Sequence, residues 1–123
     1  MKNIMVIDDS ESIRTLVKMT LDQVGYQVST AVDGQDALDQ LNGDRKNLII
    51  CDINMPRMNG FEFLETIKQN DEFSDHKFTP IIMLTTEGSE EKKSRGQMAG
   101  ARAWLTKPFI PEQLLVAVEK LCN

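Results

Sequence analysis

Three runs of consecutive apolar residues stand out along the sequence, and polar residues border each of them. They span residues 4–7, 48–51 and 81–84. Because apolar and polar residues do not alternate within them, each run predicts a strand buried on both faces, as in a parallel sheet covered by helices. Two weaker segments, residues 26–31 and 103–105, are typical of edge strands, since the first partly alternates and the second is short.

Between these runs, apolar residues recur with the spacing of helices. The clearest stripe predicts a helix that begins after the cap residue Ser10 and ends at Gly25, where a left-handed residue belongs. Its members are Ile13, Leu16, Val17, Thr20, Leu21 and Val24. Further helices are expected over residues 35–41, after Gly60, from about residue 90 to 98, and from Pro111 onward.

The predicted strands and helices alternate five times along the chain. This alternation indicates an α/β fold with a mostly parallel sheet and right-handed crossovers. Five βα units match a flavodoxin-like (βα)5 three-layer sandwich, whose five-stranded parallel sheet has the order 2-1-3-4-5. A length of 123 residues fits one domain, so residues 1–123 are expected to form a single one. The longest connection, residues 69–79, is expected to be a solvated loop that leaves His76 in solvent.

Composition and charge narrow the function classes. The chain is 41% hydrophobic, which is enough for one core, and its formal net charge is −5. This acidic balance argues against nucleic-acid binding and against a basic membrane patch. No apolar run approaches the ~20 residues of a membrane span, so a cytoplasmic protein without membrane insertion is expected. Cys51 and Cys122 lack the spacing of a metal site and are expected to be reduced, packed thiols.

Acidic, hydroxyl and basic side chains follow the predicted strands where the strands end. Asp8 and Asp9 follow the first strand, Asp52 the third, Thr85 the fourth and Lys107 the fifth. The carboxyl ends of parallel strands share one edge of the sheet, and ligands bind there between strands one and three. Each position alone has an ordinary explanation, because an Asp after a strand often caps a helix and a Lys is usually solvated. Their coincidence at four strand ends favours a functional site.

The residue types at this edge indicate a cation site. Three carboxylates in one crevice repel one another, and this repulsion raises their pKa values unless a cation is present. Carboxylate oxygens select hard ions, and two or three of them together with water suit Mg²⁺. Lys107 adds a positive charge for an anionic ligand. The sequence therefore predicts a Mg²⁺ site that also receives an anionic group.

Four motifs at the strand ends resemble the response-regulator receiver domains, in particular the single-domain chemotaxis (CheY-like) type. They are VIDDS at 6–10, DINMPRMNG at 52–60, LTTE at 84–87 and TKPF at 106–109. The resemblance covers essentially the whole chain and implies a two-component signalling switch rather than an enzyme, with no output domain. Such a switch accepts a phosphoryl group from the phosphohistidine of a sensor histidine kinase. It promotes its own phosphorylation and dephosphorylation, and in chemotaxis it signals to the flagellar motor.

The resemblance also implies a role for each residue at the strand ends. Asp52 is implied to be the phosphoacceptor, while Thr85 and Lys107 hold oxygens of the transferred group. The residues implied to hold Mg²⁺ are Asp9, Asp52, the backbone carbonyl of Asn54 and, through metal-bound water, Asp8.

The switch is expected to begin at Thr85 and the loop after it, which move to meet the phosphoryl group. In the family an aromatic residue three positions before the lysine changes rotamer with this movement, and here that residue is Trp104. By the same resemblance, the side chains of Asn54 and Glu87 modulate the rate of dephosphorylation. Pro108 is expected to follow a cis peptide bond.

The resemblance implies partners as well. A chemotaxis-type sensor histidine kinase is the expected phosphodonor of a monomeric protein, and a flagellar motor switch protein or a phosphatase is a further candidate. Residues 55–58, apolar for a surface segment, are expected to dock the kinase together with the first helix. The polar fourth helix and the edge at Trp104 are expected to form the output face. A phosphate sink and a relay receiver for a histidine phosphotransfer protein remain open as alternatives.

Two other classes share parts of this pattern. A haloacid-dehalogenase-type phosphatase also uses Asp and Mg²⁺, but it expects an acid two residues after the nucleophile, where Asn54 stands. A flavodoxin needs a Ser/Thr-rich phosphate loop after the first strand, where this chain has Asp-Asp-Ser-Glu at residues 8–11. Neither class accounts for Lys107 and Pro108 after the fifth strand.

Overall fold

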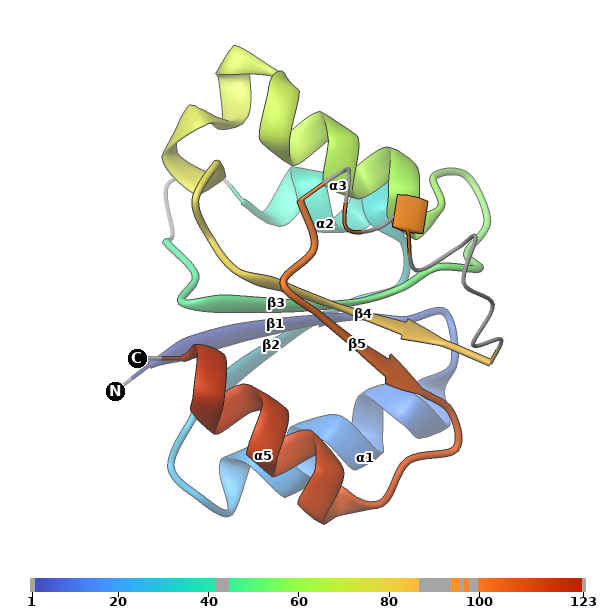
Figure 1. Ribbon diagram of the computed structural model, residues 1–123, viewed down its shortest axis with the longest axis vertical. Helices are drawn as coiled ribbons and strands as arrows, with labels where there is room; N and C mark the ends of the chain where they lie inside the picture. The colour runs from blue at the N-terminus through green and yellow to red at the C-terminus, as the bar shows by residue number, and fades with distance from the viewer. Residues whose placement is uncertain (1, 42–44, 87–93, 96, 98–99, 123) are drawn as a thin grey trace.

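A five-stranded parallel sheet with helices on both faces forms the centre of the protein (Figure 1). The computed structural model describes all residues except 1, 42–44, 87–93, 96, 98–99 and 123. The strands are β1 (Asn3–Ile7), β2 (Gln27–Ala31), β3 (Leu48–Asp52), β4 (Ile81–Thr85) and β5 (Ala103–Thr106). Their order is β2-β1-β3-β4-β5, and all neighbouring pairs are parallel. The predicted α/β flavodoxin-like fold and its strand order are confirmed.

The sheet separates two apolar cores. Helices α1 (Glu11–Asp22) and α5 (Pro111–Leu121) cover one face, and α2 (Gly34–Gln40) and α3 (Gly60–Gln69) cover the other (Figure 1). Successive strand residues point to opposite faces. In β1, Ile4 and Val6 therefore enter the core under α1 and α5, whereas Met5 and Ile7 enter the core under α2 and α3. Burial on both faces explains why the central strands are unbroken apolar runs.

Local capping residues set the helix ends. The Ser10 hydroxyl accepts the N–H of Ile13 at 3.3 Å, and Gly25 after α1 has a φ of 95°, as the sequence predicted. At the start of α3, the Asn59 side chain accepts the N–H of Glu62, whose carboxylate accepts the N–H of Asn59 in return. This reciprocal cap fixes the start of α3 directly after the loop that leaves β3.

The connection between α3 and β4 differs from its prediction. It contains the 3₁₀ helix η1 (Asp71–His76), in which Phe73 packs against the core under α2 and α3. His76 is 4% exposed, and its Nε2 donates to the carbonyl of Leu41 at 3.1 Å. The charged residues of this connection, Asp71, Glu72, Asp75 and Lys77, are exposed, as expected, but the segment forms a 3₁₀ helix and the expectation of a solvated His76 was wrong. The packing of Phe73 and the hydrogen bond from His76 to Leu41 hold η1 against the rest of the protein.

Several smaller predictions concern the remaining segments. Cys51 and Cys122 are free and buried, as expected. The predicted helix from about residue 90 to 98 lies largely outside the described residues. None of the helices over the described ranges combines the length and apolarity that crossing a bilayer requires.

Replacing His76 with Ala is expected to lower the free energy of unfolding by about 2 kcal/mol, because the Leu41 carbonyl loses its buried donor and a cavity forms. The exposed neighbour Asp75 offers a matched control, and Asp75→Ala should change stability by less than about 0.5 kcal/mol. Urea unfolding measures both values. Equal effects of the two substitutions would contradict a structural role for His76.

Candidate functional site

Three carboxylates meet at the carboxyl edge of the sheet. Asp52 is the last residue of β3, and Asp8 and Asp9 directly follow β1. The parallel register pairs Ile7 with Cys51, which brings the two strand ends level. One ligand oxygen from each of the three aspartates lies within 4.8 Å of the other two. Asp8 and Asp52 are buried and Asp9 is exposed, so solvent reaches the cluster from one side.

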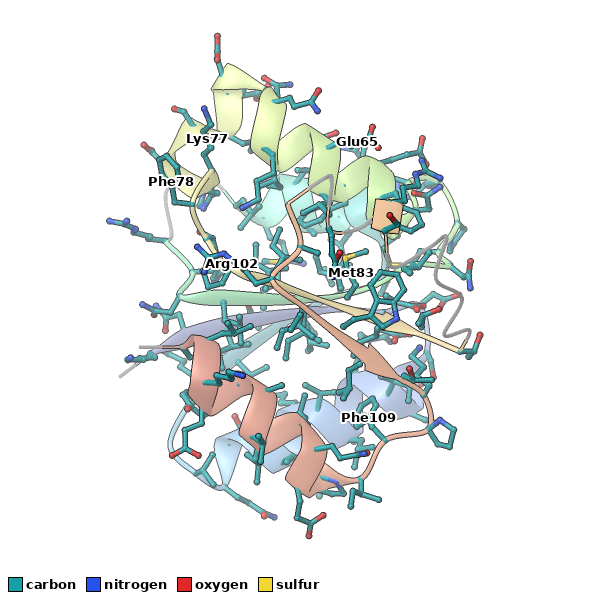
Figure 2. All side chains as sticks on the ribbon, in the orientation of Figure 1. Glu65, Lys77, Phe78, Met83, Arg102 and Phe109 are labelled. Carbon is teal, nitrogen blue, oxygen red and sulfur yellow. The ribbon has the colours of Figure 1, made fainter. Side chains whose placement is uncertain are left out.

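Lys107 enters this cluster from the far edge of the sheet. It follows β5, and its long side chain spans the position of β4 to reach the acidic residues. Its Nζ lies 2.7 Å from Asp8 Oδ2 and 3.3 Å from Asp52 Oδ1. The Lys107–Pro108 peptide bond is cis, as the sequence predicted. Phe109 then enters the core between the sheet and α5, which anchors the segment that carries Lys107 (Figure 2).

The balance of charges at this edge is negative. Burial and the neighbouring Asp8 raise the pKa of the Asp52 carboxyl to about 6, although Lys107 works in the opposite direction. Burial alone would lower the pKa of Lys107, but its hydrogen bond to Asp8 and the charges of Asp8 and Asp52 outweigh burial and raise that pKa. Three carboxylates thus face one ammonium group. Hard oxygen donors with a surplus of negative charge fit a divalent cation such as Mg²⁺.

Two interactions that the sequence prediction missed hold Asp8 in place. The backbone N–H of Ser10 donates to Asp8 Oδ1 at 2.9 Å, and Arg14 Nη1 donates to the Asp8 carbonyl at 2.7 Å. Both groups belong to the first turn of α1 or its cap. The predicted cap at Ser10 already placed the start of this helix beside Asp8, but nothing in the spacing indicated where the Arg14 side chain lies.

The other predicted site residues take different positions around the cluster. Thr85 ends β4 and is fully buried at the same edge of the sheet. Asn54 lies two residues beyond β3 on an exposed part of the following loop. Glu87 lies outside the described residues.

Trp104 lies on β5, half-buried, and packs against the core under α2 and α3. The centroid of its indole lies 6.5 Å from the centroid of the Phe61 ring. The Arg95 guanidinium lies over the same Phe61 ring, 4.3 Å from its centroid. The indole Nε1 is buried without a hydrogen-bond partner among the described residues. Trp104 also helps to line a pocket of about 60 Å³. It thus has an apolar contact with the core and borders a small pocket.

The loop of residues 55–58 is less exposed than the sequence indicated. Met55 is 9% exposed, and Met58 is half-buried against the core under α2 and α3. Core packing therefore explains the two methionines, while Pro56 and Arg57 are the exposed members of the loop.

Fold, acidic cluster and lysine together define a class of protein. The sequence matches the family described as the response regulator receiver domain over residues 4–119. The chain belongs to this family and is the receiver domain of a two-component response regulator.

The proteins that the chain resembles include a chemotaxis protein. The chemotaxis protein CheY4 of Vibrio cholerae, whose structure is solved, shares 48% sequence identity with this chain. The two structures match over 98% of each chain with a TM-score of 0.92. Protein PilG of Pseudomonas aeruginosa is 42% identical over 116 residues, which cover 94% of this chain and 84% of PilG. The phosphate regulon regulator PhoB of Escherichia coli is 35% identical over 118 residues, and the match spans only 50% of its length. The chain is thus similar to a chemotaxis protein and to about half of a longer transcriptional regulatory protein.

Proposed function

We propose that this chain accepts a phosphoryl group on Asp52 from the phosphohistidine of a sensor histidine kinase, and that the added group switches the binding of a partner. The observation that carries this proposal is the meeting of Asp8, Asp9 and Asp52 with Lys107 at one edge of the sheet. Similarity to the chemotaxis protein CheY4 supports a role in chemotaxis-type signalling.

The chemistry needs positioning and charge compensation more than covalent help from the protein. A carboxylate oxygen of Asp52 attacks the phosphorus, the P–N bond to the kinase histidine breaks, and that nitrogen takes up a proton. Lys107 Nζ, already beside Asp52, pairs with an oxygen of the transferred group, and the Thr85 hydroxyl donates to another. Hydrolysis of the acyl phosphate by water returns Asp52, and we assign modulation of its rate to the side chains of Asn54 and Glu87.

The residues that would hold Mg²⁺ are Asp9, Asp52 and the backbone carbonyl of Asn54, with Asp8 acting through water. When bound, this ion supplies positive charge against the phosphoryl oxygens. Asp8 is paired with Lys107 and is held by Ser10 and Arg14, so it orients the lysine as well as the acidic cluster.

Phosphotransfer from candidate chemotaxis-type histidine kinases tests the proposal. Wild type is expected to take up [³²P]phosphate in a Mg²⁺-dependent reaction, and Asp52→Asn is expected to remain unlabelled because an amide does not act as the nucleophile. Asp22→Asn, which removes an exposed carboxylate on α1, serves as the matched control and should be labelled like wild type. Labelling of Asp52→Asn at the level of wild type would refute the assignment.

Trp104 fluorescence is expected to change when Mg²⁺ and beryllofluoride are added, because movement of Thr85 alters the space into which the indole packs. Trp104 is the one Trp of the chain, so the signal has a single source. The beryllofluoride response should disappear in Asp52→Asn. An unchanged signal in wild type would count against coupling of Trp104 to the site.

The output partner is a finer part of the proposal. A flagellar motor switch protein or a phosphatase fits the chemotaxis-type relatives, whereas a phosphate sink or a relay to a histidine phosphotransfer protein is the alternative. A binding screen with the beryllofluoride-activated protein separates them, since a sink needs no partner that prefers the activated form.

A further inference from the structure

Asp33 and Arg57 form a two-point ion pair between the loop after β2 and the loop after β3. Arg57 Nε lies 2.7 Å from Asp33 Oδ2, and Arg57 Nη2 lies 2.9 Å from Asp33 Oδ1. The Asp33 side chain is only 4% exposed, and it also accepts the backbone N–H of Asp36 at the start of α2. Hydrogen bonds from Arg57 keep the pKa of Asp33 below its usual value, so its carboxyl stays ionised. A carboxylate fixed by the fold therefore holds the guanidinium in one orientation.

The backbone around Arg57 has an uncommon shape. Arg57 has a φ of 63°, in the left-handed region that residues other than glycine rarely adopt. The N–H of Met58 donates to the Pro56 carbonyl at 2.7 Å, which closes a three-residue γ-turn around Arg57. The Met58 carbonyl accepts the N–H of Gly34 at 3.4 Å, and a Cβ on Gly34 would lie 2.8 Å from Met58 Cγ. The neighbouring loop thus supports this turn through direct contact.

We propose that Asp33 and Arg57 are positioning residues for the Mg²⁺ site and act through the backbone that leads back to Asn54. This inference rests on the proposed function, in which the Asn54 carbonyl is a metal ligand. At the start of the loop, the N–H of Ile53 donates to a β4 carbonyl at 3.1 Å, and the Ile53 carbonyl accepts the N–H of Gly60 at 2.9 Å. Asn54 lies just beyond these bonds and is exposed. The direction of its carbonyl therefore depends on how the rest of the loop is held.

Because Arg57 is positively charged, an effect of its charge on Mg²⁺ binding can be distinguished from an effect of its positioning of the loop. A cation near a metal site repels the metal ion, so electrostatics alone predicts tighter Mg²⁺ binding when Arg57 is neutralised. Loss of positioning predicts weaker binding instead. A purely structural ion pair would lower the stability of the protein and leave the Mg²⁺ dissociation constant of the folded state unchanged.

Calorimetric titration with Mg²⁺ alone, on protein that unfolding curves show to be folded, separates these outcomes. Arg57→Gln keeps part of the aliphatic stem and the strained backbone but loses the guanidinium. Arg57→Lys keeps the charge but loses the two-point contact, and Asp33→Asn keeps an acceptor for α2. Each variant is expected to raise the Mg²⁺ dissociation constant by about tenfold, the low end for outer partners of metal sites. The double variant Asp33→Asn/Arg57→Gln should be no weaker than the weaker single variant, because both changes break the same contact.

Lys18→Gln is the control, since it removes a cation from an exposed ion pair on α1, and it should leave the dissociation constant unchanged. Unchanged or tighter Mg²⁺ binding in Arg57→Gln, or wild-type affinity in Arg57→Lys, would overturn the inference while the proposed function stands. If wild type itself bound no Mg²⁺, the proposed metal site would fail and the inference with it. The wild-type titration therefore tells the two failures apart.

Discussion

Asp52→Asn is expected to stabilise the protein by about 2 kcal/mol at neutral pH in the absence of divalent cations, although it removes the proposed phosphoacceptor. Burial and Asp8 raise the pKa of the Asp52 carboxyl to about 6, and Lys107 offsets only part of this effect. At neutral pH the ionised carboxylate is therefore held where its charge is disfavoured. An amide of nearly the same shape carries no charge and relieves this repulsion.

The pH dependence of the difference identifies its cause. The folded pKa of about 6 lies above the usual 3.8 of an Asp, so the folded state binds this proton more tightly than the unfolded chain does. The corresponding stability is present in full below about pH 4 and is lost as the pH rises through about 6. Asp52→Asn should accordingly match wild type near about pH 4 and exceed it by the full amount at about pH 7.

Urea unfolding with a chelator at both pH values measures this difference. Asp22→Asn, at an exposed carboxylate on α1, is the control and should stay within about 0.5 kcal/mol of wild type throughout. Added Mg²⁺ should stabilise wild type, because it binds the folded state only, and it should stabilise Asp52→Asn far less. If Asp52→Asn were more stable than wild type by the same amount at both pH values, removal of the Asp52 charge would not be the cause of its added stability.

The parts of the site that were predictable are those that strand position alone determines. Unbroken apolar runs located the central strands, and a parallel sheet necessarily brings the ends of these strands to one edge. The convergence of Asp8, Asp52 and Lys107 followed from this topology. The prediction needed no side-chain geometry, because residues that directly follow buried strands have little freedom in where they lie.

The features that escaped prediction depend on contacts between segments distant in sequence. His76 is buried because the carbonyl of Leu41 accepts its N–H, and no local pattern near residue 76 encodes that partner. The ion pair of Asp33 with Arg57 likewise joins two loops whose proximity appears only once α2 and α3 are packed side by side. Apolar character alone does not distinguish a docking loop from one that is packed on the core, as Met55 shows.

Gly60→Ala is expected to be the most damaging small substitution near the site. Gly60 opens α3, where a Cβ would lie 2.3 Å from the Asp52 carbonyl oxygen and 2.9 Å from the Ile53 Cα. Both of these atoms belong to the backbone, so no side chain can rotate away. The helix must withdraw from β3, which is expected to lower the free energy of unfolding by about 3 kcal/mol or more. Because the backbone of Asp52 is displaced as well, phosphotransfer to the folded variant should also slow.

Gly25→Ala serves as a comparison because it introduces backbone strain without steric contact. Gly25 has a φ of 95°, but no atom lies within 4 Å of a Cβ placed there, so its cost is the left-handed backbone alone, about 1–2 kcal/mol. At Gly60 the backbone is not left-handed, but there is no space for a Cβ. At Gly25 there is space for a Cβ, but the backbone is left-handed. Thermal and urea unfolding should therefore rank Gly60→Ala below Gly25→Ala in stability, and only Gly60→Ala should impair phosphotransfer. The reverse ranking, or equal phosphotransfer by both variants, would mean that α3 yields readily and that its close approach to Asp52 does not hold the phosphoacceptor in place.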